Sequence, residues 1–193
     1  MAAAHAIWAP FRHRWPALSD TVPVRIREAL VEDAPAIAHV HVAAWRVAYR
    51  GLLPQEHLDQ LDEGRRAEVW VHLISSADER SRTYVAELEG GGIIGFANAA
   101  PSRDADASAH GEIPAIYVHP DSWGAGAGRA LMEAARAWLV QAGFRSASLW
   151  VLADNVRARG FYETDGWRLD GTVKRDESRG FPVVEVRYDR RLP

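Results

Sequence analysis

Cysteine is absent from this chain of 193 residues. Disulfides, thiolate zinc ligands and a thiol nucleophile are therefore excluded, and with them an acyl-cysteine intermediate. The sequence also contains no apolar run near the ~20 residues that a membrane-spanning helix needs, so we expect no membrane partner.

The chain also has no excess of basic side chains, because its net charge is −3 at pH 7. A general nucleic-acid-binding protein presents a basic surface, so we expect no nucleic-acid partner. The eight histidines are scattered without a recurring ligand spacing, so we expect no metal.

The first 21 residues differ from the rest of the chain. Residues 1–19 contain two arginines and two prolines but no acidic side chain. They also contain no apolar segment of the kind that a targeting peptide needs. We therefore expect residues 1–21 to form a poorly ordered tail, because termini are ordered only when they are tied down. Residues 22–193 are expected to form a single cytoplasmic domain.

Hydrophobic periodicity predicts seven strands and four helical regions. Alternation or short apolar runs indicate strands at residues 22–27, 83–88, 93–99, 113–118, 148–152, 167–173 and 183–188. Helical spacing indicates helices from Asp33 to about Tyr49, over 54–61 and 63–74 as one broken region, from the glycine run to Gly143, and over 155–164. Residues 101–111 are polar and small, which indicates a loop. Because strands and helices do not simply alternate, this order favours a mixed α/β sheet.

A glycine run in residues 116–131, IYVHPDSWGAGAGRAL, is the most informative segment. A β-branched strand stops at Pro120, three glycines follow at Gly124, Gly126 and Gly128, and a helix begins at once. Glycines allow a close backbone approach to a ligand, and the new helix directs its unpaired N–H groups at the same place. This combination favours a phosphate group.

A Rossmann dinucleotide site is the obvious rival interpretation. Strand, glycines, helix and strand run in order, and Asp154 follows the second strand, where a ribose-binding acid would lie. The fingerprint Gly-x-Gly-x-x-Gly fails, however, because its third glycine position, counted from Gly124, is Arg129. Five residues also separate Val118 from Gly124, which is too many. An NAD-dependent oxidoreductase is therefore a remote alternative.

A second motif lies downstream, in LWVLADNVRARGFYETDGW. It supplies a strand, then Asn155, Ala158, Phe161-Tyr162 and Gly166-Trp167. The two motifs in this order, separated by one helix, resemble the GCN5-related N-acetyltransferases over about residues 22–190. The resemblance implies a mixed, mostly antiparallel twisted sheet of about seven strands flanked by four helices.

The same resemblance implies the function. It implies transfer of an acetyl group from acetyl-CoA to a primary amine of a small molecule or peptide, by direct attack in a ternary complex. A non-catalytic acyl-CoA-binding or sensing module with the same fold is the alternative.

In this family the strand before the glycines pairs with the pantetheine arm, and the glycine run holds the pyrophosphate. The residues so implicated are Ile116, Tyr117 and Val118, whose N–H is expected to hold the thioester carbonyl, and Gly124, Ala125, Gly126, Ala127, Gly128 and Arg129. Trp123 and Ala125 stand where the family often has glutamine or arginine and a basic residue. Binding should therefore rest mainly on backbone donors, with Arg129 the best side-chain cation. Arg157 and Arg159 are further candidates, or simply solvated charges.

Three polar residues are candidates for the chemistry, and each has a structural alternative. Asn155 either caps the short helix or also binds the pantetheine amides. Tyr162 matches the family's general acid, which protonates the leaving thiolate, although a tyrosine at helical spacing is also a common core residue. Glu112, at the start of the strand that leads to the glycines, is a candidate general base or a solvated glutamate at a loop edge.

The acceptor side is less well defined by the sequence. Trp45 and Tyr49 are one helical turn apart and form either the wall of an acceptor pocket or part of the core. Protein N-terminal acetylases in this family often carry a glutamate where this chain has Trp150, which disfavours a peptide substrate of the ribosomal-protein type. The loop at 101–111 and the aromatic tail are candidates for covering the site or for contacts in a homodimer.

Overall fold

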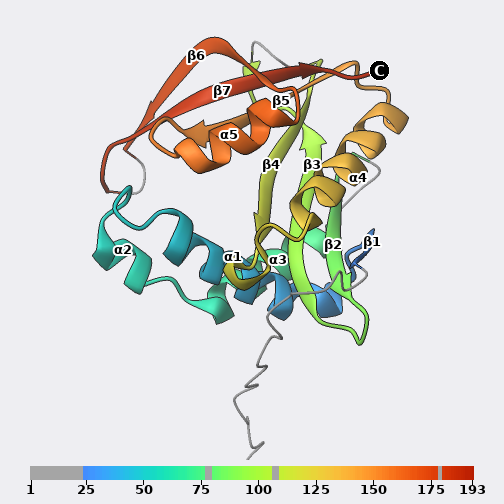
Figure 1. Cartoon of the computed structure of the whole chain (residues 1–193), viewed down its shortest axis with the longest axis vertical. Coiled ribbons are helices and arrows are strands. Elements are labelled where there is room, and N and C mark those ends of the chain that lie inside the picture. The colour runs from blue at the N-terminus through green and yellow to red at the C-terminus, as the bar shows by residue number, and fades with distance from the viewer. Residues whose placement is uncertain (1–23, 77–79, 106–108, 178–179) are drawn as a thin grey trace, which may run out of the picture.

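One sheet of seven strands forms the centre of the protein, in the spatial order β1-β2-β3-β4-β5-β7-β6 (Figure 1). The computed structural model describes residues 24–76, 80–105, 109–177 and 180–193, so the tail expected at 1–21 lies outside the described residues. The strands are β1 (Val24–Glu28), β2 (Arg82–Leu88), β3 (Ile93–Pro101), β4 (Gly111–Val118), β5 (Ser146–Leu152), β6 (Arg168–Asp176) and β7 (Val183–Arg191). Neighbouring strands are antiparallel except β4 and β5, which are parallel. The predicted mixed, mostly antiparallel sheet is confirmed.

Five α-helices flank the sheet in the described part of the chain, one more than predicted. They are α1 (Ala34–Ala48), α2 (Gln55–Asp59), α3 (Glu63–Ser75), α4 (Ala127–Gln141) and α5 (Val156–Thr164). The region expected to be one broken helix is two helices because Asp62 starts a new one. Its carboxylate accepts a hydrogen bond from the backbone N–H of Arg65 at 2.7 Å, which caps α3.

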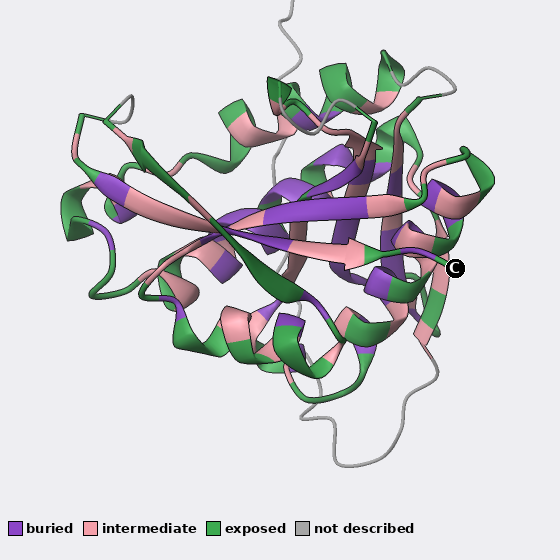
Figure 2. Cartoon of the chain, turned by 90° about the horizontal axis from the view of Figure 1, so that it is seen from above, coloured by how far each residue is buried: buried purple, intermediate pink, exposed green. Residues whose placement is uncertain are grey.

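The helices cover the two faces of the sheet. α4 packs against β1 to β4, whereas α1 packs against β3 and β4, and α3 packs against α1 (Figure 1). Leu131 and Leu139 of α4 share one buried cluster with Tyr162 of α5. Ile37 of α1 and Trp70 of α3 belong to a second cluster. Buried residues accordingly concentrate along the strands between these layers (Figure 2).

The strands β4 and β5 separate soon after they meet. They pair only at Gly111 with Ala147 and at Glu112 with Ser148, whereas β4 stays paired with β3 as far as Val118. Gly111 and Glu112 also pair with Pro101 and Ala100 of β3, so β4 starts at residue 111 instead of 113 and the loop expected at 101–111 is shorter. The divergence opens a wedge in the middle of the sheet.

A buried histidine, His41, lies between α1 and the sheet. The indole N–H of Trp70 donates to His41 Nδ1 at 3.2 Å, so the neutral ring carries its proton on Nε2. The ring stacks on Tyr117, with a centroid distance of 4.9 Å. Burial, and secondarily the charge of Arg66, lowers the pKa of His41 to about 3. Protonation of this ring therefore destabilises the folded protein relative to the unfolded chain.

We expect His41 to make the protein less stable in mild acid. Between pH 6.5 and about 3 the unfolded chain binds a proton at His41 that the folded chain does not, so the free energy of unfolding falls as the pH falls. From pH 7 to pH 5 this single group accounts for about 2 kcal/mol. Urea unfolding at the two pH values measures it. In His41→Phe, the difference in the free energy of unfolding between pH 7 and pH 5 should shrink by that amount. His72 is exposed and serves as the control, so an equal decrease in His72→Gln would contradict the assignment to His41.

Candidate active site

A cavity of about 660 Å³ occupies the wedge between β4 and β5. The predicted site residues that line it are Tyr49, Ile116, Tyr117, Val118, Gly124, Gly126, Ala127, Gly128, Arg129, Asn155 and Tyr162. Three predicted residues are not in its lining: Ala125 lies between two lining glycines, Trp45 contacts Tyr49 edge-on, and Glu112 lies at the start of β4. The fold therefore brings most of the predicted set around one space.

The backbone of Val118 faces this cavity. Val118 lies opposite Gly95 of β3, and in the next pair the His119 N–H donates to the Ile94 carbonyl at 2.8 Å. Hydrogen-bonded and non-hydrogen-bonded pairs alternate in an antiparallel ladder, so the N–H and C=O of Val118 point away from β3. The Trp123 indole N–H donates to this C=O at 2.8 Å. The N–H of Val118 is thus directed into the wedge as a donor.

The glycine run connects β4 to α4 with two residues in the left-handed region. Gly124 and Gly126 both have φ of +86°, a conformation that other residues adopt at a cost. The first helical bond runs from Ala130 N–H to the Gly126 carbonyl. The N–H groups of Ala127, Gly128 and Arg129 therefore precede the first intrahelical bond and lie at the positive end of the helix dipole. This end of the cavity is suited to an anion.

Tyr162 of α5 is a buried tyrosine that lines the cavity. Its side chain is only 8 % exposed. Burial, together with the nearby Tyr117 hydroxyl, raises the pKa of Tyr162 well above its usual value. The phenol is therefore protonated at neutral pH and available as a proton donor.

A pair of phenols links the residue after α1 to β4 at the same cavity. The hydroxyls of Tyr49 and Tyr117 are 3.0 Å apart. The pKa of Tyr49 is raised by burial first, then by Tyr117, Tyr162 and the carboxylate of Glu185. The predicted wall residue Tyr49 is thus held in place by a strand that lines the predicted donor site.

Asn155 has the capping role that its position suggested. It lies just before α5 and is buried, and its Oδ1 accepts from the Ala158 N–H at 3.1 Å. Within the described residues its amide Nδ2 donates no hydrogen bond to the protein. That group remains available to a ligand in the cavity that Asn155 lines.

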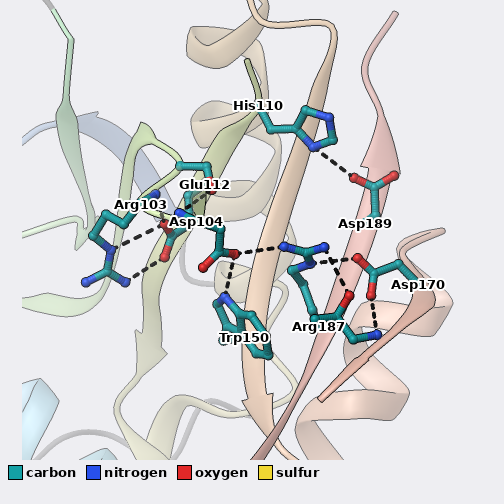
Figure 3. Close-up of polar contacts among 10 residues, drawn as sticks. Arg103, Asp104, His110, Glu112, Trp150, Asp170, Arg187 and Asp189 are labelled. Atoms are coloured by element: carbon teal, nitrogen blue, oxygen red, sulfur yellow. Dashed lines mark hydrogen bonds and ion pairs between the residues drawn. The ribbon is translucent and has the colours of Figure 1, made fainter. Parts of the chain in front are cut away.

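Glu112 is buried in an ion pair with Arg103 (Figure 3). Arg103 donates to Oε1 at 2.6 Å through Nη2 and to Oε2 at 3.0 Å through its backbone N–H. The carboxylate predicted as a general base therefore fixes the loop that follows β3. Its lone pairs are directed at a cation and not at the cavity lining.

One lining residue that sequence reasoning did not assign to the site is Trp150 of β5. Its indole N–H donates to Asp104 Oδ2 at 2.9 Å, and Arg187 donates to the same oxygen at 3.1 Å. Arg187 also bonds Asp170 of β6 at 2.6 Å (Figure 3). This network holds the Trp150 ring in a fixed orientation. The family comparison had pointed to the position of Trp150, but the members of this network are far apart in the sequence, so no spacing predicts that Asp104 and Arg187 meet there.

Among residues 24–76, 80–105, 109–177 and 180–193, no three His, Asp or Glu side chains are grouped closely enough to hold a metal ion. No helix in that part of the chain is both long and apolar enough to cross a bilayer. The polar groups around the cavity include backbone N–H groups, phenols, the Asn155 amide and the guanidinium groups of Arg129 and Arg157.

A family model described as the acetyltransferase (GNAT) family matches residues 42–167, which include the glycine run and the Asn155–Tyr162 motif. The chain belongs to the GNAT family. YuaI of Bacillus subtilis, named an uncharacterized N-acetyltransferase, is 35% identical over 171 residues, which cover 84% of this chain and 95% of YuaI. Rv2775 of Mycobacterium tuberculosis, named a probable N-acetyltransferase, is 31% identical, with 88% of this chain and 96% of Rv2775 covered.

The fold of this GNAT protein is also found in a solved structure of another protein. The PaiA N-acetyltransferase of Thermoplasma acidophilum, crystallised with coenzyme A, superposes with a TM-score of 0.67 at 18% identity, covering 88% of this chain and 99% of PaiA. The family membership predicted from the two motifs is thus confirmed. The glycine run lies in a GNAT domain with a mostly antiparallel sheet, which removes the basis for the Rossmann interpretation.

Proposed function

We propose that this GNAT protein transfers the acetyl group of acetyl-CoA to a primary amine of a small molecule or peptide, by direct attack within a ternary complex. The observation that carries the proposal is the convergence of three groups on one cavity. These are the inward-facing N–H of Val118, the N–H groups at the start of α4, and the protonated phenol of Tyr162. N-acetyltransferase names among the relatives support the reaction class.

The donor side of the cavity fits acyl-CoA. The left-handed glycines leave open space at the helix N-terminus, because a Cβ added at Gly124 or Gly126 would meet no atom within 4 Å. Phosphate groups suit this end of the cavity, and the unpaired edge of β4 suits the amides of a pantetheine arm. The thioester supplies an activated acyl group when it is bound. The Val118 N–H then donates to its carbonyl oxygen, where negative charge develops during attack.

Tyr162 completes the transfer as the general acid. The amine nitrogen forms a bond to the acyl carbon while the carbon–sulfur bond breaks, and Tyr162 gives its proton to the departing sulfur. The acceptor amine loses a proton in the same process. Glu112 lies outside the cavity lining and is held by Arg103, so we propose that this proton passes to water.

We propose that the acceptor amine binds against the part of the cavity wall that comes from α1, the residue after it and β5. This part of the lining includes Ala44 and Ala48 of α1, Tyr49, and Trp150 of β5. Because the Trp150 N–H is engaged by Asp104, the residue offers mainly an apolar surface. An amine with a hydrocarbon portion next to its nitrogen suits this wall.

Free-thiol release tests the proposal. Protein and acetyl-CoA are mixed with a panel of polyamines, amino acids, aminoglycosides and peptides, and CoA release is followed with a thiol reagent. The chain has no cysteine that would add to the signal. Amine-dependent release supports the enzyme. CoA binding without release for any amine would instead favour a non-catalytic acyl-CoA-binding module.

A further inference from the structure

Arg157 of α5 and Trp123, just ahead of the glycine run, form a close cation–π pair in the cavity wall. The guanidinium carbon lies 3.7 Å from the centre of the indole ring, and both residues line the cavity. We infer that Arg157, positioned by Trp123, binds a phosphate group of CoA. This inference rests on the proposed function and assigns a residue that the family motifs left open.

Trp123 is held firmly enough to act as a platform. Its indole N–H donates to the Val118 carbonyl at 2.8 Å, and its own backbone N–H donates to the Pro120 carbonyl at 3.2 Å. The ring is therefore tied to the end of β4 on one side and to the turn before the glycines on the other. A cation stacked on this ring lies next to Gly124, where the phosphate-binding backbone begins.

The hydrogen-bond donors of Arg157 have no partner within the part of the chain that the structure describes. Among the described residues, its guanidinium group makes no hydrogen bond and no ion pair. Arg159 on the same helix differs, because it donates to the Tyr188 hydroxyl at 3.1 Å and to the Ala153 carbonyl at 2.8 Å. Stacking occupies only the flat face of a guanidinium group and leaves its N–H groups pointing outward in the plane. Arg157 therefore presents a fixed set of free donors at the cavity.

The stacked Arg157 supplies a cation that the glycine run itself lacks next to Gly124. The glycine run has Trp123 and Ala125 at the positions where the family often has glutamine or arginine and a basic residue. Trp123 has no charge with which to bind a phosphate. Its ring instead stacks on Arg157 of α5 and so holds a cation beside the glycine run. A planar guanidinium group can donate two parallel hydrogen bonds to phosphate oxygens. The cation is thus supplied from a neighbouring helix instead of from the loop.

Calorimetric titration with CoA and with 3′-dephospho-CoA tests the role of Arg157. Arg157→Gln should weaken CoA binding about 10-fold, a modest value for a charged hydrogen bond because the side chain is exposed. A loss seen with both ligands assigns the contact to the pyrophosphate, and a loss seen with CoA alone assigns it to the 3′-phosphate. The matched control is Arg65→Gln, an exposed helical arginine on α3 outside the cavity lining.

Three results separate failure of this inference from failure of the proposed function. If the unchanged protein does not bind CoA, the proposed function fails. If it binds CoA and Arg157→Gln binds equally well, only the assignment of Arg157 is overturned. A loss of the same size at 50 mM and 500 mM salt would also overturn it, because a charge contact weakens with screening and a packing defect does not.

The platform role of Trp123 has its own test in a double-mutant cycle. Trp123→Leu removes the ring and should weaken CoA binding in the unchanged background, but much less in Arg157→Gln, because the two residues act together. Trp123→Phe keeps an aromatic face and should retain more affinity than Trp123→Leu. Strictly additive losses would contradict the coupling of Trp123 and Arg157.

Discussion

Tyr162→Phe is expected to lower turnover by about 10²–10⁴-fold, the usual contribution of a general acid, with CoA affinity retained. The phenylalanine ring keeps the contacts of the tyrosine ring with Phe161 and Tyr188. Only the hydroxyl is lost, and with it the proton that this phenol carries at neutral pH. Thiol release under steady-state conditions gives kcat, and calorimetry gives the CoA affinity.

Tyr84→Phe is the matched control for this substitution. Tyr84 is a partly buried tyrosine of β2 that packs on the same core cluster and lies outside the cavity lining. Its turnover should equal that of the unchanged protein. Full turnover in Tyr162→Phe would transfer the role of proton donor to another group. A loss of CoA binding that accounts for the whole decrease would make Tyr162 a cofactor-positioning residue.

Features encoded in short sequence segments could be predicted from the sequence. The glycine run and the Asn155 motif are both local patterns, and their resemblance to the GNAT motifs predicted the family and the fold. The cap at Asn155 was predictable for the same reason, since a capping residue and its N–H partner are three residues apart. The functional roles of these residues stay predictions until they are measured.

Features that depend on long-range pairing could not be predicted. Whether Glu112 faces a substrate or an arginine depends on how the loop after β3 folds back, and Arg103 gave no signal in the sequence. Trp150 is fixed by Asp104 and Arg187, which meet only after β5 and β7 have paired. The stacking of Arg157 on Trp123 likewise requires α5 to lie beside the glycine run. Side-chain partners of this kind follow from tertiary packing and leave no periodic pattern.

Gly126→Asp is expected to abolish measurable CoA binding. A carboxylate at this position would lie beside the bound phosphate groups at the N-terminus of α4. Two like charges about 4 Å apart repel by roughly 4 kcal/mol at a protein surface, which corresponds to about a 10³-fold loss of affinity. The φ of +86° adds a smaller backbone cost for any residue with a Cβ. Calorimetric titration with CoA measures the loss.

Two control variants separate the charge of Gly126→Asp from its shape. Gly126→Asn has almost the same shape without the charge, and asparagine tolerates positive φ better than most residues, so this variant should retain detectable CoA binding. Gly143→Asp places the same carboxylate at a φ of +90° with equally open space, but after the far end of α4, so it should bind CoA normally. Equal losses in Gly126→Asn and Gly126→Asp would mean that backbone shape and not charge governs the loop. Unchanged CoA affinity in Gly126→Asp would show that the glycine run does not bind phosphate, and the cofactor would then have to lie elsewhere in the cavity.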